Sequence, residues 1–364
     1  MMSKNHFLEL LPPKIDYTSI IKEISEANRI LGSLNGLLAN IPNQSLLISP
    51  LLTKEAVASS KIEGTQATIE EVFKYEAEGK NSEKDSKEQD IREIINYRTA
   101  IHTAVSLLKK KPIGENFIKT LHSILLDSVR GANKDKGNFR KTPVFIGKPG
   151  ATIKNAIYVP PSAAELNDFI SNWGMFVNSP DEPDILVQTA IAHYQFEAIH
   201  PFLDGNGRIG RLLIPIMLYE KGILSYPLLY VSEYFEQNRD DYYAYLRMVD
   251  KENDWESWIR YFLTSIKEQA LDTQNKVLNM LELYKTVKEK LSDFNSQYAI
   301  HLLDIIFENP VTSFRNIKTK INTNSYQTIY NLLNKFQEEK ILIEVTGGKR
   351  NKIYVFDELM KVIR

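Results

Sequence analysis

His200-Pro201-Phe202-Leu203-Asp204-Gly205-Asn206-Gly207-Arg208-Ile209-Gly210-Arg211 is the stretch from which the rest of this chain is best understood. It places a histidine, a carboxylate, three glycines, an asparagine and two arginines within twelve residues. An apolar run from Leu212 to Leu218 follows directly. This order predicts a loop that leads into the N-terminus of a helix.

The predicted loop has the composition of an anion-binding site. Gly205, Gly207 and Gly210 allow the backbone to approach a ligand closely, so that successive N–H groups can converge on phosphate oxygens. The N-terminus of the following helix adds unpaired donors and a partial positive charge. Arg208 and Arg211 are three residues apart, so in a helical turn they share a face and can hold a polyphosphate together.

Two other side chains supply chemistry to this site. Asp204 offers a hard oxygen ligand, as a nucleotide-bound Mg²⁺ requires. His200 has the pKa range of a general base. The residues therefore predict a nucleoside triphosphate in the loop, with His200 directed at an incoming hydroxyl. The alternative is a helix-capping loop whose charges are incidental.

The stretch resembles, at every defining position, the motif HPFx(D/E)GNGRxxR of the Fic family, and the chain resembles a Fic protein adenylyltransferase. The resemblance implies a mainly α fold, namely an all-helical Fic fold with a small β-hairpin flap. It implies catalytic roles for His200 and Asn206, a magnesium-binding role for Asp204, and ATP as substrate. The residues that it places on ATP are Gly205, Asn206, Gly207, Arg208, Ile209, Gly210 and Arg211.

A second region resembles the part of the family that closes over the nucleotide base. It runs from Ser232 to Tyr243, and within it Gln237, Tyr242 and Tyr243 are the residues expected to contact adenine. The alternative is that the two tyrosines belong to the helical core.

The segment Ser59-Ser60-Lys61-Ile62-Glu63-Gly64 is similar to the inhibitory motif (S/T)xxxE(G/N) of the family. Ser59 and Glu63 are four residues apart and lie on one helical face. The resemblance implies that Glu63 pairs with Arg211 and keeps ATP from placing its γ-phosphate productively. The physical reason is that a carboxylate occupies the guanidinium that a phosphate would otherwise use. The alternative is a solvated glutamate near a helix end.

The N-terminal region is expected to be helical. Residues 1–14 are predicted to form a loosely held arm. Apolar spacing predicts a helix over 17–39. Ser49 and Pro50 predict the start of a helix that ends near Ile62 before Gly64, and Thr68 with Glu71 forms a capping box for the next helix. The charged residues 74–91 predict a solvated linker.

Further helices are predicted over 92–108, 116–129 and 184–199, with His122 in a structural role. Residues 142–146 and 153–159 are prone to form strands around a Gly/Pro turn, which predicts a hairpin. This hairpin resembles the family's flap. The resemblance implies that a target protein docks on residues 141–159 by strand addition, and the alternative is a purely structural hairpin.

The helix before the motif also supports a rival enzyme hypothesis. His193, Glu197 and His200 follow each other at i, i+4 and i+7, with Asp204 nearby, which could group metal ligands for a metal-dependent hydrolase. The series is not HExxH, and a zinc site has no need of the glycine and arginine residues that follow.

The C-terminal residues resemble a winged helix-turn-helix domain. Helices are predicted over 298–307, 314–320 and 325–337, followed by strands over 341–346 and 352–356. The wing carries Lys349, Arg350 and Lys352, and the recognition helix would open with Ser325, Tyr326, Gln327 and Tyr330. Because Glu338, Glu339 and Glu344 dilute this charge, the residues leave DNA binding and protein docking or dimerisation both open.

The composition indicates the general class of protein, its domain organisation and its expected location. The 364 residues are 43% hydrophobic and 25% charged, which is typical of a globular protein with several domains. We expect an N-terminal helical region (1–91), a catalytic core (92–270), a connector (271–295) and a winged-helix domain (296–364). The chain contains no cysteine, no apolar stretch long enough for a membrane span and no signal peptide, so a cytoplasmic location is expected by default. A homodimer is compatible with the sequence.

The resulting prediction is a protein adenylyltransferase that transfers AMP from ATP to a serine, threonine or tyrosine hydroxyl, including its own. Three alternatives stay open. The first is transfer of another nucleotide or phosphate group. The second is removal of AMP from a modified protein. The third is a DNA-binding regulator whose Fic domain senses nucleotide.

Overall fold

Two helices at the centre of the molecule position the 200–211 stretch, whose second half belongs to the second of them. The computed structural model describes residues 8–41, 43–79, 86–129, 134–147, 150–321, 323, 325–348 and 350–364. Helix α7 (Ile185–Ile199) leads into the loop, and α8 (Asn206–Glu220) follows it. Thirteen of the fifteen residues of α7 are buried, which is expected of a helix surrounded on all sides.

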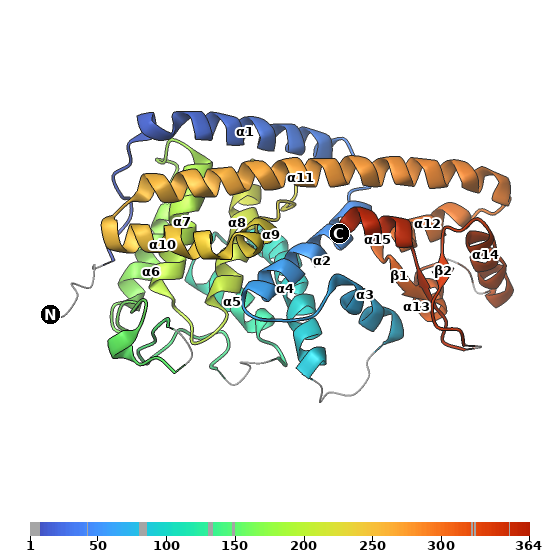
Figure 1. The fold of residues 1–364 in the computed structure, drawn as a ribbon, viewed down its shortest axis with the longest axis horizontal. Helices are drawn as coiled ribbons and strands as arrows, with labels where there is room; N and C mark the ends of the chain where they lie inside the picture. The colour runs from blue at the N-terminus through green and yellow to red at the C-terminus, as the bar shows by residue number, and fades with distance from the viewer. Residues whose placement is uncertain are drawn as a thin grey trace.

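The helices around this central pair form a bundle (Figure 1). They are α4 (Ser86–Leu108), α5 (Glu115–Leu125), α6 (Leu166–Asn178), α9 (Ser232–Gln237), α10 (Arg239–Glu252) and α11 (Trp255–Lys290). Helix α1 (Tyr17–Ala39) lies along α11, as Figure 1 shows, with Asp16 as its N-cap. The prediction of a mainly α fold is confirmed. Among the described helices, none combines the length and apolarity needed to cross a membrane.

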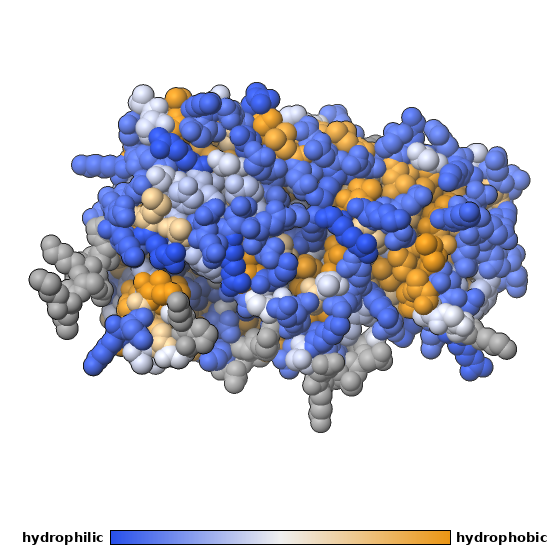
Figure 2. Space-filling view, in the orientation of Figure 1, coloured by the Kyte–Doolittle hydropathy of each residue, from blue (hydrophilic) through white to orange (hydrophobic). Residues whose placement is uncertain are grey.

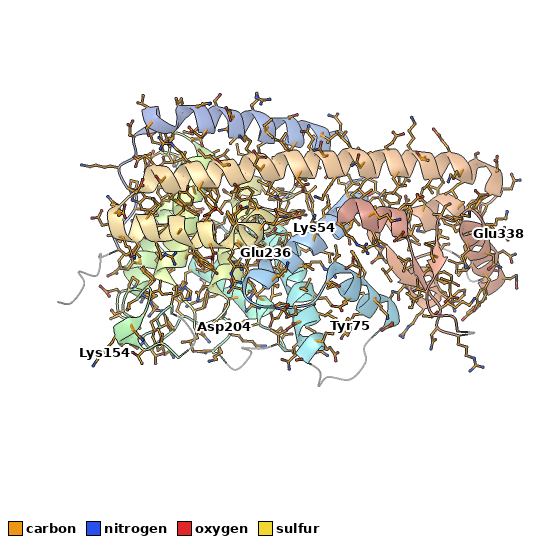
Figure 3. The ribbon with its side chains drawn as sticks, viewed as in Figure 1. Lys54, Tyr75, Lys154, Asp204, Glu236 and Glu338 are labelled. Atoms are coloured by element: carbon orange, nitrogen blue, oxygen red, sulfur yellow. The ribbon has the colours of Figure 1, made fainter. Side chains whose placement is uncertain are left out.

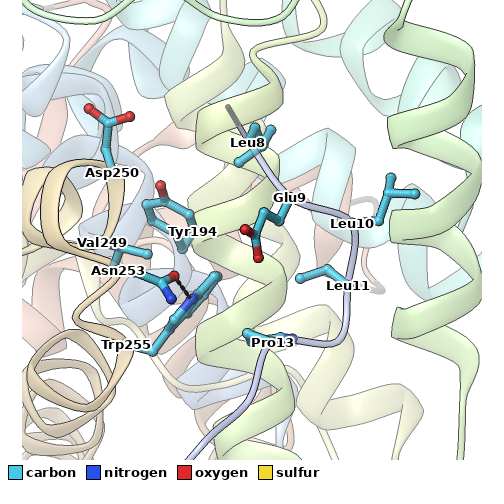
Figure 4. A pocket seen from close by; sticks show the side chains of 10 residues that line it. All are labelled: Leu8, Glu9, Leu10, Leu11, Pro13, Tyr194, Val249, Asp250, Asn253 and Trp255. Atoms are coloured by element: carbon cyan, nitrogen blue, oxygen red, sulfur yellow. Dashed lines mark hydrogen bonds between the residues drawn. The ribbon is translucent and has the colours of Figure 1, made fainter. Parts of the chain in front are cut away.

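The N-terminal arm is held more firmly than the sequence suggested. Residues 8–13 run across α7 beside Tyr194 and Trp255 (Figure 4). The backbone of Leu11 exchanges two hydrogen bonds with the Asn172 side chain, at 2.7 and 3.0 Å. The prediction of a loose arm is therefore wrong for residues 8–13, because these polar pairs and the buried Leu11 fix it. Residues 1–7 lie outside the described residues.

Helix α2 (Ser45–Ile62) begins earlier than predicted. The sequence indicated an N-cap at Ser49, but Pro50 lies inside the helix. The prediction of this start is wrong because Leu46, Leu47 and Ile48 are buried, and helical geometry packs them against the core despite the N–H that proline lacks. The C-terminus is as predicted, since Gly64 follows in the left-handed region at φ +98°.

The charged segment 74–91 is largely structured. Helix α3 (Ile69–Glu78) starts with the predicted capping box of Thr68 and Glu71, and α4 starts at Ser86. Glu88 is buried because it accepts a 2.7 Å hydrogen bond from Tyr75, and Asp90 is buried where it accepts one from the Gln66 N–H at 2.9 Å. The prediction of a solvated linker is wrong for these helical residues, and residues 80–85 lie outside the described residues.

The predicted hairpin is reduced to one antiparallel bridge between Ile146 and Tyr158. A short 3₁₀ helix, η1 (Ile153–Asn155), replaces the start of the second predicted strand. The Asn155 side chain accepts a 2.6 Å hydrogen bond from the Thr152 N–H, and such local bonds compete with a strand ladder. The Tyr158 hydroxyl donates to the Ala198 carbonyl at 2.9 Å and thereby ties this segment to α7. Residues 148 and 149 lie outside the described residues.

The C-terminal residues form a separate group of elements (Figure 1). Helix α11 runs without a break across the boundary expected at residue 270, and η2 (Leu291–Phe294) follows it. The elements beyond it are α12 (Ala299–Glu308), β1 (Val311–Ser313), α13 (Phe314–Lys320), α14 (Tyr326–Glu338), β2 (Ile343–Glu344), β3 (Ile353–Val355) and α15 (Asp357–Ile363). The strands form an antiparallel sheet in the order β1-β3-β2. The sequence did not predict β1 or α15.

This C-terminal group packs on α2 and α3. The Lys54 ammonium donates to the Arg364 carbonyl at 2.6 Å, and the Asn316 amide donates to the Glu76 carbonyl at 3.0 Å. Helix α12 also packs against α2. The C-terminal elements therefore contact the helix that carries Ser59 directly, and the division into four domains remains a prediction.

Candidate active site

The loop between α7 and α8 is shaped by two left-handed residues and one asparagine. His200 leaves α7 at φ 49°, and Gly205 starts α8 at φ 78°, a conformation that glycine adopts without strain. The Asn206 side chain accepts from the Phe202 N–H and donates to the Phe202 carbonyl, both at 2.9 Å. Asn206 thus closes the loop on itself, with Phe202 anchored in the core.

His122 supports the loop from α5. Its ring stacks on Phe202 at 3.7 Å between centroids. Its Nδ1 accepts a hydrogen bond from the Gly137 N–H at 2.8 Å, so its Nε2 carries the proton and donates to the Asp204 carbonyl at 2.9 Å. Burial lowers the pKa of His122 to about 4, which keeps this neutral tautomer. The arrangement agrees with the expected structural role.

Arg140 holds the backbone on which His200 sits. Its Nε donates to the His200 carbonyl at 2.8 Å, its Nη2 donates to the Ile199 carbonyl at 3.3 Å, and its own N–H donates to the Pro201 carbonyl at 2.9 Å. The side chain is buried. A guanidinium with several fixed acceptors therefore sets the position of His200.

The His200 imidazole is suited to accept a proton. Burial lowers its pKa to about 4, so the ring is neutral near pH 7. Its Nδ1 lies 3.3 Å from the Glu197 carbonyl. A ring that donates to this carbonyl leaves the Nε2 lone pair available, as a general base needs.

Arg211 is buried, and its Nε and Nη2 bond to residues of α2 and of its C-cap. Its Nη2 donates to Glu63 Oε1 at 2.6 Å and to the Ser59 carbonyl at 2.9 Å, while its Nε donates to Ser59 Oγ at 3.0 Å. Burial opposes ionisation of Glu63, but the charge of Arg211 outweighs it, and the pKa of Glu63 is lowered. Glu63 is therefore ionised and paired near pH 7.

The Glu63 carboxylate lies against the first turn of α8. A Cβ built on Gly207 would approach Glu63 Oε1 to 2.3 Å and Arg211 Nη1 to 2.8 Å. Only a glycine at this position leaves space for the carboxylate. Gly64 gives the chain the positive φ with which it leaves α2. A carboxylate thus occupies the end of a helix where an anion is favoured.

Arg208 has different partners from Arg211. Its Nη1 lies 3.0 Å from Glu93 Oε2, and its Nη2 donates to Asp204 Oδ1 at 3.3 Å. The Thr65 hydroxyl, two residues after Glu63, donates to the same Glu93 oxygen at 2.9 Å. The two motif arginines are therefore both buried, and each is paired with carboxylates.

Asp204 is partly exposed at the mouth of the loop (Figure 3). No three His, Asp or Glu side chains in the described ranges are grouped to hold a metal ion. His193, which the rival hypothesis used, lies with Nδ1 3.1 Å from the Gly210 carbonyl and Nε2 2.9 Å from the Tyr242 hydroxyl. Mg²⁺ bound to one carboxylate and to phosphate oxygens fits Asp204 without further protein ligands.

A cavity of about 310 Å³ opens beside Glu197 and Ala198, between α10 and the segment that carries Ile146 and Tyr158. Tyr243 lines this cavity. Its neighbour Tyr242 is buried in an aromatic cluster and bonds to His193, and Gln237 is exposed outside the lining. The structure therefore brings Tyr243 to the cavity but not Tyr242 or Gln237.

The remaining motif residues, Ile209 and Gly210, lie on the buried side of the site. Ile209 is buried in the core. A Cβ on Gly210 would lie 2.3 Å from Glu197 Oε1, so Gly210 makes space for this carboxyl group. Within the described residues Glu197 Oε1 has no hydrogen-bond partner, and burial raises the pKa of Glu197 to about 7. The sequence singled out Glu197 only as a metal ligand.

Sequence reasoning missed three residues of this site: Arg140, Glu93 and Thr65. Arg140 had one local signal, its place after Gly137-Asn138-Phe139 before the hairpin. Glu93 lies at the start of the helix predicted over 92–108, directly after the charged segment 74–91, and nothing near it in the sequence indicates a buried partner.

Two sequence profiles of the Fic/DOC family match the chain. The N-terminal profile matches residues 21–106, and the main profile matches residues 112–218, which include the whole motif. Together with the fold and the geometry of the motif, these matches show that the chain belongs to the Fic/DOC family.

Two named relatives match part of the chain. A protein adenylyltransferase Fic from Drosophila grimshawi is 31% identical over 172 residues, which cover 46% of this chain and 31% of the relative. A protein adenylyltransferase Fic from Culex quinquefasciatus is 33% identical over 140 residues, which cover 37% of this chain and 24% of the relative. The match thus spans less than a third of the length of these relatives.

Solved structures share the fold. A Fic family protein from Desulfovibrio desulfuricans G20 superimposes with a TM-score of 0.59 at 19% identity, covering 95% of this chain and 98% of that one. Fic-1 (residues 134–508) from C. elegans gives a TM-score of 0.57 at 18% identity, covering 73% and 75%. At these identities the likeness supports the fold alone.

Proposed function

We propose that the protein is an adenylyltransferase that moves AMP from ATP to a hydroxyl side chain of a target protein and of itself. The observation that carries this proposal is the position of the Glu63 carboxylate, held by Arg211 against the first turn of α8. That position is an anion site with a buried guanidinium, an aligned helix N-terminus and His200 nearby. A phosphate of ATP would take the place of the carboxylate.

His200 acts as the general base in the proposed reaction. Its Nε2 removes the proton from the hydroxyl of a serine, threonine or tyrosine while the hydroxyl oxygen attacks the α-phosphorus. A new P–O bond forms to the target, the bond from the α-phosphorus to the β-phosphate oxygen breaks, and pyrophosphate leaves. General base help of this kind contributes roughly 10²- to 10⁴-fold.

The rest of the loop binds and orients the nucleotide. Backbone N–H groups at Gly205–Gly207 stabilise the charge that develops on the α-phosphate. Arg208 and Arg211 hold the outer phosphates once their carboxylate partners are displaced. Asn206 keeps the loop in shape through Phe202. A Mg²⁺ held at Asp204 would neutralise phosphate charge, and the cavity lined by Tyr243 is the place for the base.

The segment 141–159 is the proposed docking site for the target. Phe145, Ile146 and Ile157 are exposed large apolar side chains, and Ile146 and Ile157 line the cavity. Among the described residues, Ile146 and Tyr158 form an isolated bridge and the Thr142 carbonyl accepts from Arg140, so the segment has little strand pairing of its own and an added strand could pair with residues 143–145. This docking would present a target hydroxyl without reading its sequence.

Ser59, Glu63 and Gly64 form the proposed inhibitory element. In the present arrangement Glu63 and Ser59 together accept three hydrogen bonds from Nε and Nη2 of Arg211, so these donors are taken up and a phosphate would have to displace Glu63 to reach them. Activation requires that Glu63 leaves this position.

Labelled ATP tests the proposal. The Glu63→Gly variant is incubated with Mg²⁺ and ATP that carries label on either the α- or the γ-phosphate. We expect α-label on the protein, release of pyrophosphate and no γ-label. Transfer of γ-label would instead identify phosphoryl transfer and contradict the proposal. Lys61→Gly is the matched control, because it loosens the same helical turn but leaves the carboxylate in place.

A further inference from the structure

The C-terminal elements carry an exposed face that the proposed reaction does not use. Helices α13 and α14 form it, at the end of the molecule remote from the motif, as the positions of Glu338 and Asp204 show in Figure 3. Residues 296–364 contain ten lysines and arginines against seven aspartates and glutamates, a net charge of +3, whereas the whole chain has −1. This end of the protein is therefore the basic one.

Aromatic side chains gather on this face instead of in the core. Phe314 stacks on Tyr330 at 4.4 Å and on Tyr326 at 5.6 Å between ring centroids. Tyr326 is 54% exposed and Tyr330 is 46% exposed. The Lys318 ammonium lies 3.8 Å from the centre of the Tyr326 ring. Exposed rings held in a fixed stack beside a cation are suited to contact a partner.

Amide side chains occupy the exposed positions between and beyond these rings. Ser325 caps α14 by accepting from the Thr328 N–H at 3.2 Å, so the helix starts sharply at Tyr326. Gln327, Asn331 and Asn334 are exposed along α14, and Gln327 donates to Asn331 at 2.7 Å. Glutamine and asparagine side chains can pair with both the N6 and N7 edges of adenine in the major groove.

The charged residues of this face are mainly basic, which favours a polyanion as its partner. The residues of α14 before Glu338 include no acid, and Lys318 of α13 lies against Tyr326 at its start, while Lys320 at the end of α13 pairs with Glu308 at 3.2 Å. The turn between β2 and β3 adds Arg350 and Lys352. Figure 2 shows hydrophilic residues over the outer edge of this end, where α14 lies, and an apolar area beside it, over α15 and the small sheet.

We propose that this face binds duplex DNA, with α14 in the major groove. The exposed amides of α14 contact base edges, while the basic residues of α13 and of the β2–β3 turn contact the phosphates. The order α12, α13, α14 and the β2–β3 hairpin corresponds to the helix-turn-helix arrangement in which the last helix reads the groove. The binding is independent of ATP and of the proposed adenylyl transfer.

The first test measures binding to DNA directly. The full chain is titrated against a fluorescent duplex of roughly 30 base pairs and mixed sequence, from about 50 to 200 mM salt, without nucleotide. We expect binding that weakens steeply as salt rises. The double variant Arg350→Ala with Lys352→Ala should lower the salt slope by about 2, since each phosphate contact contributes about 1. Lys109→Ala with Lys110→Ala removes equal charge from an exposed turn after α4, outside the C-terminal elements, and should bind like the parent.

The second test separates base reading from phosphate binding. A pool of random duplexes is selected on the parent, and the enriched sequence is measured against Gln327→Ala with Asn331→Ala. We expect this variant to lose preference for the enriched sequence but to keep its binding to mixed duplex. Circular dichroism and thermal melting verify that all variants fold.

Two results would overturn the proposal. One is absence of DNA binding at the lowest salt, or an equal loss of DNA affinity in the Arg350→Ala/Lys352→Ala variant and in the Lys109→Ala/Lys110→Ala control. The other is self-association of the chain in sedimentation that Tyr330→Ala abolishes, with no DNA binding, which would assign the face to a second copy.

Discussion

Glu63 Oε1 lies 2.6 Å from Arg211 Nη2, and the Arg211 side chain is only 1% exposed. One helix thus supplies a carboxylate to an arginine of another helix at the point where α8 begins. Breaking a buried pair of this kind leaves a charge unpaired unless another anion replaces it. This makes the polyphosphate of ATP the natural competitor of Glu63.

Loss of Glu63 should strengthen ATP binding. The Glu63→Gly variant frees Arg211 and removes a negative charge beside the phosphates. Arg211 can then form a charge-assisted hydrogen bond to a phosphate of ATP without first losing its bond to Glu63. We therefore expect affinity for ATP to rise roughly tenfold or more. Calorimetric titration measures this. Adenosine, which lacks phosphates, should bind parent and variant equally. Equal affinity for ATP in both forms would refute the competition.

Arg140 should act by positioning His200. Arg140→Lys keeps the charge but loses the set of bonds to the carbonyls of residues 199 and 200. We expect the transfer rate in the Glu63→Gly background to fall roughly 10- to 100-fold, because small displacements of a catalytic group have effects of this size. ATP affinity should not change. A parallel loss of rate and ATP affinity would indicate a structural defect instead.

The rate of transfer should stay flat to unusually low pH. Burial lowers the pKa of His200 to about 4, so the neutral base persists well below pH 6. Glu63 raises this pKa, so in the Glu63→Gly variant it lies lower still. Rates of self-modification measured across pH should decline only below about pH 5. A half-maximal rate near pH 6.5 would correspond to an ordinary histidine and would contradict this account.

Glu55 should make the stability of the protein depend on pH. Burial raises its pKa from 4.5 to about 7, although Ser232 and Tyr97 donate hydrogen bonds to it. The contribution of Glu55 to the free energy of unfolding is therefore fully present below about pH 4.5 and is lost as pH rises through 7. Glu55→Gln cannot ionise, so relative to the parent it should gain about 2 kcal/mol in free energy of unfolding between pH 5.5 and 8. Urea unfolding at both pH values measures the difference, and a constant difference would contradict the prediction.

Contiguous features of the site could be predicted from the sequence. The loop, its glycines and the helix that follows are encoded within twelve neighbouring residues, and the helix end at Gly64 follows from one residue that tolerates positive φ. The mainly α fold follows from apolar spacing over whole helices. Such signals are local, and their physics does not depend on distant partners.

Long-range pairs could not be predicted. Glu93 meets Arg208 across 115 positions of the sequence, so its burial depends on a partner that local composition does not reveal. Tyr242 and Tyr243 are neighbours on α10, but they point in directions about 100° apart, and only the packing of α10 decides which one faces the cavity. The reduced hairpin likewise depends on a local Thr152–Asn155 bond that competes with strand pairing.

Intact-mass analysis after incubation with Mg²⁺ and ATP tests the central claim most directly. The parent, Glu63→Gly, Lys61→Gly and the double variant Glu63→Gly with His200→Ala are compared. The account predicts a gain of one or more AMP groups in Glu63→Gly, a much smaller gain in the parent and in Lys61→Gly, and none in the double variant. Equal AMP gain in parent and Glu63→Gly, or AMP gain that survives the loss of His200, would contradict it.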